Sequence, residues 1–165
     1  MPVAKLKAFL DSNQVHYQCI PHPVAYTAQG TAALAHLPGR ELAKTVMVRI
    51  DGALAMAVLP ASAHVDLVRL RRGVGARDAS LVPEAEFRDR FPDCEVGAMP
   101  PFGNLYGMRV FVDESLAADK EIGFNAGSHR ELIRLSYEDF VRLVKPMVLQ
   151  FAASLDMESV GAWHL

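Results

Sequence analysis

The chain has little cysteine, no long apolar run and almost no net charge, and each shortage excludes a class of protein. Its two cysteines, Cys19 and Cys94, are too few for a disulfide framework and form no close metal-binding pair. The longest apolar run, residues 53–60, is far shorter than the roughly 20 residues that span a bilayer, and the first residues lack the basic-then-apolar order of a secretory signal. We therefore expect a cytoplasmic protein without a membrane partner.

Recognisable nucleotide and metal motifs are also missing. The sequence contains no Walker-type or GxGxxG loop, and its six histidines are scattered without the close spacing of a zinc site. We expect no metal and no cofactor. A net charge of −2 argues against a general basic coat for nucleic acid, so no DNA partner is expected, although a local basic patch is compatible with this total.

What is present is the composition of one globular domain, 51% hydrophobic and 22% charged. The strongest local signal is Asp51-Gly52 between two β-rich runs, which predicts a type I′ hairpin, and the apolar character of both runs places it centrally in a sheet. Strands and helices do not alternate strictly, which favours a mixed sheet with packed helices, an α/β (α+β) fold. We predict helices over 3–10, 27–37, 65–70, 83–91 and 137–144, and strands over 15–20, 44–50, 53–59, 109–112, 121–125 and 131–135, with a turn at 127–129.

The stretch GAMPPFGN, residues 97–104, stands out for its backbone chemistry. Pro100 and Pro101 have no N–H, so any amide that the loop presents comes from Gly97, Ala98 or Met99. Glycine lets the backbone approach a ligand, and amide hydrogens of this kind stabilise a developing oxyanion. The alternative is an ordinary surface loop rich in proline and glycine.

Lys44 and a cluster of four arginines each have a structural and a functional interpretation. Lys44 begins an apolar strand, so its ammonium either ends at the surface over a packed stem or lies at the rim of a cavity, where it meets a phosphate. Four arginines either form a solvated face or a local patch for a polyanionic substrate. These arginines are Arg69, Arg71, Arg72 and Arg77.

Candidate nucleophiles and bases are few. His129 shares a glycine-containing turn with Ser128, but a lone histidine is more often structural than catalytic, and Ser128 lacks the strand-turn-helix elbow of a serine nucleophile. Cys94 is a nucleophile in principle without an evident base, and Cys19 is expected in the core of a strand.

Five blocks, in this order and spacing, resemble the YbaK-like, prolyl-tRNA synthetase-associated domain family of aminoacyl-tRNA deacylases. The blocks are HPVAYTAQ, PGRELAKTVMV, VLPAS, CEVGAMPPFGN and FNAGSHRELIRLSYEDF, and the resemblance extends over about Val15 to Lys145. It implies a single YbaK-type domain over residues 1–153, with a curved mixed sheet flanked by helices. We expect residues 154–165 to form a flexible tail.

The resemblance also implies roles for individual residues. Lys44 would hold the terminal phosphate or ribose of tRNA, and the loop from Gly97 through Ala98 and Met99 to Pro101 would bind the aminoacyl carbonyl and its oxyanion. Substrate-binding positions would follow at a glycine turn and in a pocket that selects by size. These are Gly127, Ser128 and His129 in the turn, and Tyr26, Thr27, Val46 and Leu59 in the pocket.

The implied activity is hydrolysis of the ester that links a wrong, small amino acid to tRNA. An aminoacyl ester is already activated, so a positioned water and a stabilised oxyanion suffice without a catalytic triad. The implied partners are a mischarged tRNA and, as an open question, an aminoacyl-tRNA synthetase. Two alternatives also stay open: a non-catalytic module that binds tRNA or a synthetase, and a hydrolase of another small ester or amide.

Overall fold

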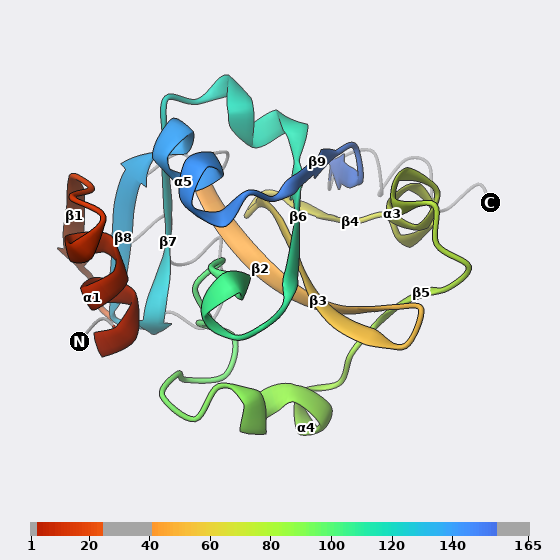
Figure 1. Ribbon diagram of the computed structural model, residues 1–165, viewed down its shortest axis with the longest axis horizontal. Helices are drawn as coiled ribbons and strands as arrows, with labels where there is room; N and C mark the ends of the chain where they lie inside the picture. The colour runs from red at the N-terminus through yellow and green to blue at the C-terminus, as the bar shows by residue number, and fades with distance from the viewer. Residues whose placement is uncertain (1–2, 25–40, 155–165) are drawn as a thin grey trace.

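A mixed β-sheet forms the centre of the protein, whose computed structural model describes residues 3–24 and 41–154 (Figure 1). The strand order is β1-β8-β7-β2-β3-β6-β9, and β5 also pairs with β2. Three pairs are parallel, β2 with β7, β3 with β6 and β6 with β9, and the other pairs are antiparallel. The strands of this sheet are β1 Tyr17–Pro21, β2 Leu42–Ile50, β3 Ala53–Pro60, β5 Ala79–Leu81, β6 Arg109–Asp113, β7 Glu121–Ser128, β8 Glu131–Ser136 and β9 Met147–Leu149.

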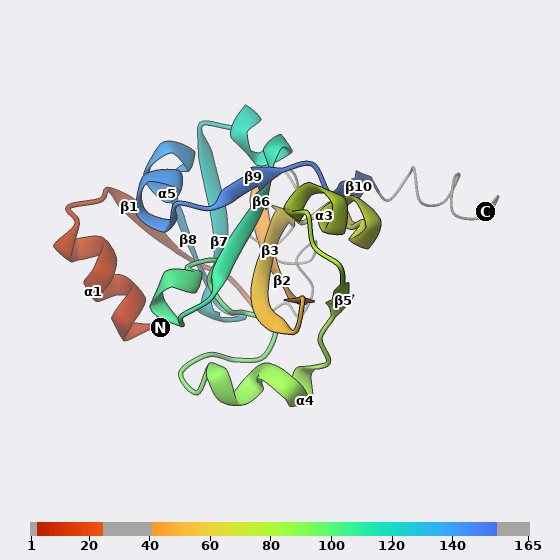
Figure 2. The ribbon, with the colours of Figure 1, turned by 45° about the vertical axis from the view of Figure 1, so that its right-hand side comes forward.

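Helices cover both faces of the sheet. On one face, α1, α4 and α5 bury leucine, phenylalanine and valine side chains in the larger core cluster. On the other, α3 packs with Phe151 and with the small sheet β4–β10 over a second cluster, and Figure 2 shows α3 beside β9 and β10. The remaining elements are α1 Ala4–Ser12, β4 Ala63–Val65, α3 Leu67–Val74, α4 Glu84–Phe87, α5 Tyr137–Val144, β10 Ala152–Ser154 and the 3₁₀ turns η1 Arg88–Arg90, η2 Gly103–Leu105 and η3 Glu114–Ala118.

The predicted hairpin is confirmed as β2–β3, in the middle of the sheet. Asp51 and Gly52 have φ of +49° and +86°, the pair of positive values that a type I′ turn requires. The Asp51 carboxylate also accepts hydrogen bonds from the amides of Arg77 and Asp78, which ties the turn to the segment before β5. The mixed α/β architecture, a curved sheet flanked by helices, is therefore as expected.

Two different strands pair with the two ends of β2, and the stretch of β2 between them positions the site. β7 pairs with Leu42 and Ala43 at the start of β2, whereas β5 pairs with residues 48–50 at its end. Within the described part of the chain, residues 44–46 pair with β3 alone. In Figure 1, β2 and β7 diverge from this point toward their carboxyl ends. Lys44 is thus the first residue of β2 beyond the β7 pairing.

Several details differ from the sequence prediction. Pro83 is the N-cap of α4 and not its first residue, and the helix becomes 3₁₀ after Phe87. The helix predicted over 65–70 begins at Leu67 instead, because the Asp66 side chain caps the amides of Val68 and Arg69. Cys19 is exposed, because β1 is an edge strand and buries few of its side chains.

The predicted turn over 127–129 is also shifted. Gly127 and Ser128 belong to β7, which has an irregularity between Asn125 and Ser128, and the turn itself lies at His129 and Arg130. The helix predicted over 27–37 and the tail after Ser154 lie outside the described residues, whereas Ser154 itself still pairs with Ala63. No helix in the described ranges is long and apolar enough to cross a membrane.

Candidate functional site

Lys44 lies half-buried on β2 with no carboxylate paired to its ammonium anywhere in residues 3–24 or 41–154. Burial lowers the pKa of this lysine, because desolvation disfavours the charged form. A buried charge without a partner is unfavourable unless a ligand supplies the opposite charge. Lys44 is therefore suited to an anionic group of a ligand.

The loop after α4 makes a tight turn at Val96 and Gly97. The amide of Ala98 donates to the Glu95 carbonyl at 3.1 Å, and Gly97 has φ of +84°, a value that favours glycine. Ala98, Met99, Pro100 and Pro101 are buried, which fixes the loop from behind. The backbone of Gly97 is held in one conformation as a result.

The three predicted amide donors of this loop are not equivalent. The amide of Ala98 is used by the turn, so it has little capacity left for a ligand. The amides of Gly97 and Met99 make no hydrogen bond within the described ranges. These two amides are the loop's available donors for a carbonyl or an oxyanion.

Four hydrogen bonds fasten this loop to the end of β7. The amide of Glu95 donates to the Gly127 carbonyl at 2.7 Å, and the amide of Gly127 donates to the Ala98 carbonyl at 2.9 Å. The amide of His129 donates to the Glu95 carboxylate at 2.9 Å, and the Nε2–H of His129 donates to the Val96 carbonyl at 2.7 Å. The GAMPP loop and the segment 127–129, predicted separately as parts of a site, are therefore brought together.

Gly127 is required at this junction. Its φ is +101°, and a Cβ atom there would lie 2.1 Å from Cγ2 of Val3, which precedes α1. Gly97 is less crowded, since a Cβ would lie at ordinary contact distance, 3.5 Å, from Cε1 of His129. Ser128 is half-buried, and its hydroxyl accepts a hydrogen bond from the amide of Arg130 at 3.3 Å, a local turn contact.

Strand β7 connects Lys44 with the loop. The parallel pairing of Ala43 with Phe124 makes Asn125 the neighbour of Lys44, and two residues further on Gly127 binds the loop. The lysine and the amide-bearing turn thus adjoin the same half of one strand. Sequence reasoning missed Glu95, whose carboxylate accepts a hydrogen bond from the His129 amide, and Asn125, the neighbour of Lys44. Both belong to the blocks CEVGAMPPFGN and FNAGSHRELIRLSYEDF.

Two of the predicted pocket residues, Val46 and Leu59, lie on the same face of the sheet as Lys44. Leu59 is directly opposite Lys44 in the β2–β3 pair and is fully buried, and Val46 is half-buried two residues along β2. Both pack in the second core cluster. Tyr26 and Thr27 lie outside the described residues.

The predicted arginine patch lies elsewhere on the molecule. Arg69, Arg71 and Arg72 are on α3 and Arg77 follows it, beyond β3 and β6 from the loop, on the right in Figure 1. Arg69 pairs with Asp66 at 3.6 Å, and all but the partly buried Arg71 are exposed. The structure gathers these arginines on one side without bringing them to the loop.

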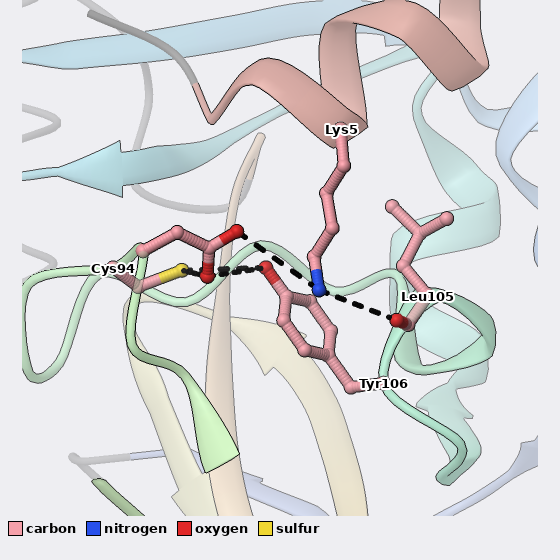
Figure 3. Close-up of polar contacts among 5 residues, drawn as sticks. Lys5, Cys94, Leu105 and Tyr106 are labelled. Atoms are coloured by element: carbon pink, nitrogen blue, oxygen red, sulfur yellow. Dashed lines mark hydrogen bonds and ion pairs between the residues drawn. The ribbon is translucent and has the colours of Figure 1, made fainter. Parts of the chain in front are cut away.

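Cys94 is not suited to nucleophilic attack. Its thiol lies 3.4 Å from the Tyr106 hydroxyl and close to Asp93, while the Lys5 ammonium stacks on the Tyr106 ring at 3.7 Å (Figure 3). Burial chiefly, with the Asp93 carboxylate, raises the pKa of this thiol to about 11. Cys94 is therefore a neutral thiol at physiological pH. The contacts among Lys5, Asp93, Cys94 and Tyr106 hold the segment before the loop against α1.

A cavity of about 560 Å³ lies beside Pro60, Ser62 and Ala152, and none of the predicted site residues within the described ranges lines it. Its buried carboxylate, Asp113, accepts hydrogen bonds from the amides of Phe151 and Ala152 and from the hydroxyl and amide of Ser115. These contacts fix the segment before β10, so Asp113 has a structural role. Among the described residues no group of three histidine, cysteine, aspartate or glutamate side chains is arranged to hold a metal ion.

Comparison with known proteins agrees with this arrangement. Residues 22–143 match the model of the aminoacyl-tRNA editing domain. A relative from Escherichia coli (strain K12), the multifunctional Ser/Thr-tRNA deacylase ProXp-y, is 26% identical over 152 residues, 89% of this chain and 90% of the relative.

Two solved structures have the same fold. One is a putative trans-editing enzyme for prolyl tRNA synthetase, with a TM-score of 0.80, 18% identity and coverage of 92% of this chain and 97% of that one. The other is the hypothetical protein APE2540, with a TM-score of 0.81, 18% identity and coverage of 90% and 99%.

Proposed function

The chain belongs to the aminoacyl-tRNA editing domain family, and on that premise we propose that it is a free-standing deacylase of mischarged tRNA. It hydrolyses the ester between a wrongly attached small amino acid and the 3′ end of tRNA. The observation that carries this proposal is that Lys44, which has no ion-pair partner among the described residues, and the loop with the available amides of Gly97 and Met99 adjoin the same half of β7.

The reaction requires no covalent intermediate. Water adds to the ester carbonyl carbon, and the carbonyl oxygen becomes an oxyanion that accepts hydrogen bonds from the Gly97 and Met99 amides. The bond to the ribose oxygen then breaks, that oxygen takes the proton from the added water, and the free amino acid leaves. Lys44 binds the terminal phosphate or ribose and so fixes the ester over the loop.

His129 positions the loop. Its ring holds the Val96 carbonyl and its amide holds the Glu95 side chain, so the turn that carries Gly97 cannot rotate freely. Gly127 completes the junction, because only glycine fits against Val3 at that backbone conformation. Preorganised donors of this kind lower the barrier without reorganising during the reaction.

The substrate is a small amino acid. Leu59 and Val46, on the face that carries Lys44, limit the space for the side chain, and the related protein is named a Ser/Thr-tRNA deacylase. A synthetase discriminates against an amino acid smaller by one methylene by only about 1–3 kcal/mol, so a second hydrolytic sieve is useful. The arginines of α3 and Arg77 contact the tRNA body away from the ester. The protein acts in the cytoplasm on tRNA that a synthetase has mischarged and released, so a synthetase supplies its substrate.

A panel of tRNAs mischarged with Ala, Ser, Thr, Cys or Pro tests the proposal. We expect the wild-type protein to release at least one small amino acid and Lys44→Ala to lose most of that activity while it keeps its thermal unfolding midpoint. Release of none, with tRNA binding intact, would favour a non-catalytic binding module. Equal turnover of an aminoacyl ester with and without the tRNA body would favour a general small-ester hydrolase.

A further inference from the structure

Asn125 is the polar side chain next to Lys44 on the sheet. Ala43 pairs with Phe124 in the parallel β2–β7 ladder, so the following residues, Lys44 and Asn125, project from the opposite face to that pair. The antiparallel pairing of Asn125 with Leu132 agrees, because Leu132 belongs to the small apolar cluster on the Lys44 face. The members of that cluster are Leu42, Ala61, Leu132 and, partly buried, Ile20.

No group in the described residues donates a hydrogen bond to the side-chain carbonyl of Asn125. Its Oδ1 atom is buried and makes no hydrogen bond within the described residues, although the residue as a whole is only half-buried. Buried polar atoms without a partner are rare in native proteins, because each is unfavourable by about 1–3 kcal/mol. An acceptor in this state, beside the lysine of a substrate site, is suited to a donor that the substrate brings.

The surroundings favour a neutral donor. A second ammonium, such as the α-amino group of the substrate, would be repelled by the ammonium of Lys44, with which no carboxylate of the described residues forms an ion pair. A hydroxyl carries no such penalty. Leu132, which pairs with Asn125 across the β7–β8 ladder, is fully buried and packs with Leu42 and Ala61, and a hydrogen bond beside such apolar side chains is more discriminating than one in water.

We propose that Asn125 accepts a hydrogen bond from the side-chain hydroxyl of the substrate, so that the site prefers seryl and threonyl esters to alanyl esters. This inference rests on the proposed deacylase function and adds the residue that selects among small amino acids. A pocket that excludes by size alone separates serine poorly from alanine, since the two differ by one oxygen atom. The Asn125 carbonyl supplies the missing distinction.

The test measures binding, so that it does not depend on turnover. The probes are 3′-seryl- and 3′-alanyl-amino-3′-deoxyadenosine, whose amide link resists hydrolysis, titrated calorimetrically into the full chain. The wild-type protein should bind the seryl probe about 2- to 13-fold more tightly, the ratio expected for one net hydrogen bond. This comparison needs no variant, and a protein that binds both probes equally or binds neither would overturn the inference.

Three variants locate the effect. Asn125→Leu has nearly the same shape without an acceptor and should bind the two probes equally, with alanyl binding unchanged. Asn125→Asp keeps an acceptor oxygen and should keep the seryl preference. Gln18→Leu makes the same kind of change at an exposed position of β1 and should match wild type. Equal losses for both probes in Asn125→Leu, with an unchanged unfolding midpoint, would show a general role and contradict the inference.

Turnover separates this inference from the function on which it rests. If the wild-type protein prefers the seryl probe through Asn125 but hydrolyses no aminoacyl-tRNA, the proposed deacylase activity fails and the selection of a hydroxyl stands. If it hydrolyses seryl- and alanyl-tRNA with equal kcat/KM and binds both probes equally, the deacylase stands and the role of Asn125 is refuted.

Discussion

The Nε2–H of His129 donates to the carbonyl oxygen of Val96 at 2.7 Å, which requires the ring to carry its proton on that nitrogen. The ring thus fixes the peptide immediately before Gly97, the residue whose amide we propose as a donor to the ester carbonyl. His129→Ala should therefore lower kcat/KM by about 10-fold or more, while the lost hydrogen bond lowers stability by only about 1–2 kcal/mol.

His129→Gln is the matched variant, because its amide nitrogen can also donate to the Val96 carbonyl. It should recover part of the lost rate. Deacylation kinetics and urea unfolding of both variants check this prediction. A His129→Ala protein with wild-type kinetics would mean that the loop keeps its shape without the ring.

Lys44 should lower the stability of the fold and raise the deacylation rate. Because burial lowers its pKa, the folded state disfavours the charged lysine, and stability rises with pH between the folded-state pKa and the higher pKa of the unfolded chain. Lys44→Met removes the buried charge, so its unfolding midpoint should equal or exceed that of wild type while kcat/KM falls about 10- to 100-fold, the loss of a charge-assisted contact. Calorimetry with deacylation assays measures both quantities. A destabilised, active Lys44→Met would contradict a ligand-binding role.

Gly127→Ala should be one of the most harmful single changes in the chain. The new Cβ would overlap Cγ2 of Val3, and φ of +101° is strained for any other residue. We expect a loss of about 3 kcal/mol or more. In the double variant Val3→Ala/Gly127→Ala the overlap disappears but the backbone strain persists, so part of the loss should be recovered. Urea denaturation of both variants tests this, and no recovery would mean that the strain alone dominates.

Acid should selectively remove the contribution of Asp113. Burial alone would raise the pKa of Asp113, but the hydrogen bonds from Ser115, Phe151 and Ala152 outweigh it and hold the pKa below 3.8. The ionised form therefore stabilises the fold above that pH, and this stabilisation is lost as the pH falls through the lower folded-state pKa. Asp113→Asn should be less stable than wild type by about 2–3 kcal/mol at pH 7, and the gap should narrow below pH 4. A gap independent of pH would exclude the charge as its source.

Cys94→Ala should keep deacylation within about twofold of wild type, because a thiol with a pKa of about 11 is protonated and unreactive at neutral pH. Alkylation of Cys94 by iodoacetamide should accelerate only as the pH rises toward 11. Mass spectrometry of the labelled peptide follows this rate. Loss of activity in Cys94→Ala without loss of stability would reopen a covalent mechanism.

Local sequence patterns predicted the elements whose chemistry is local. Asp51-Gly52 specifies its hairpin, and the helix predicted over 137–144 is α5, whose N-cap Ser136 accepts a hydrogen bond from the amide of Asp139, because each of these signals acts within a few residues. The turn at residues 127–129 was misplaced for the opposite reason. Gly127 reads as a turn glycine, whereas the structure uses it as a strand residue pressed against Val3, a contact that no local pattern reports.

Some site residues can likewise be recognised from local sequence, and others cannot. Lys44 and the glycine-proline loop are visible in the sequence because a lysine that begins an apolar strand stands out and because glycine and proline mark a loop by residue type alone. The hydrogen bond from the His129 amide to the Glu95 carboxylate and the position of Asn125 beside Lys44 both join residues that are distant in the chain. The second depends on the pairing of β2 with β7. The arginine patch was predicted from a cluster of arginines in the sequence, and such a cluster does not show how far the helix that carries it lies from the loop.

The parallel pairing of residue 42 with residue 123 also bears on when the protein becomes active during synthesis. A ladder between such distant segments has a high contact order and forms late in folding. On the ribosome, a nascent chain that has not yet exposed strand β7 holds its lysine and its amides in separate, unassembled pieces. A nascent chain that lacks β7 therefore cannot hydrolyse the aminoacyl-tRNAs that surround it during its own synthesis.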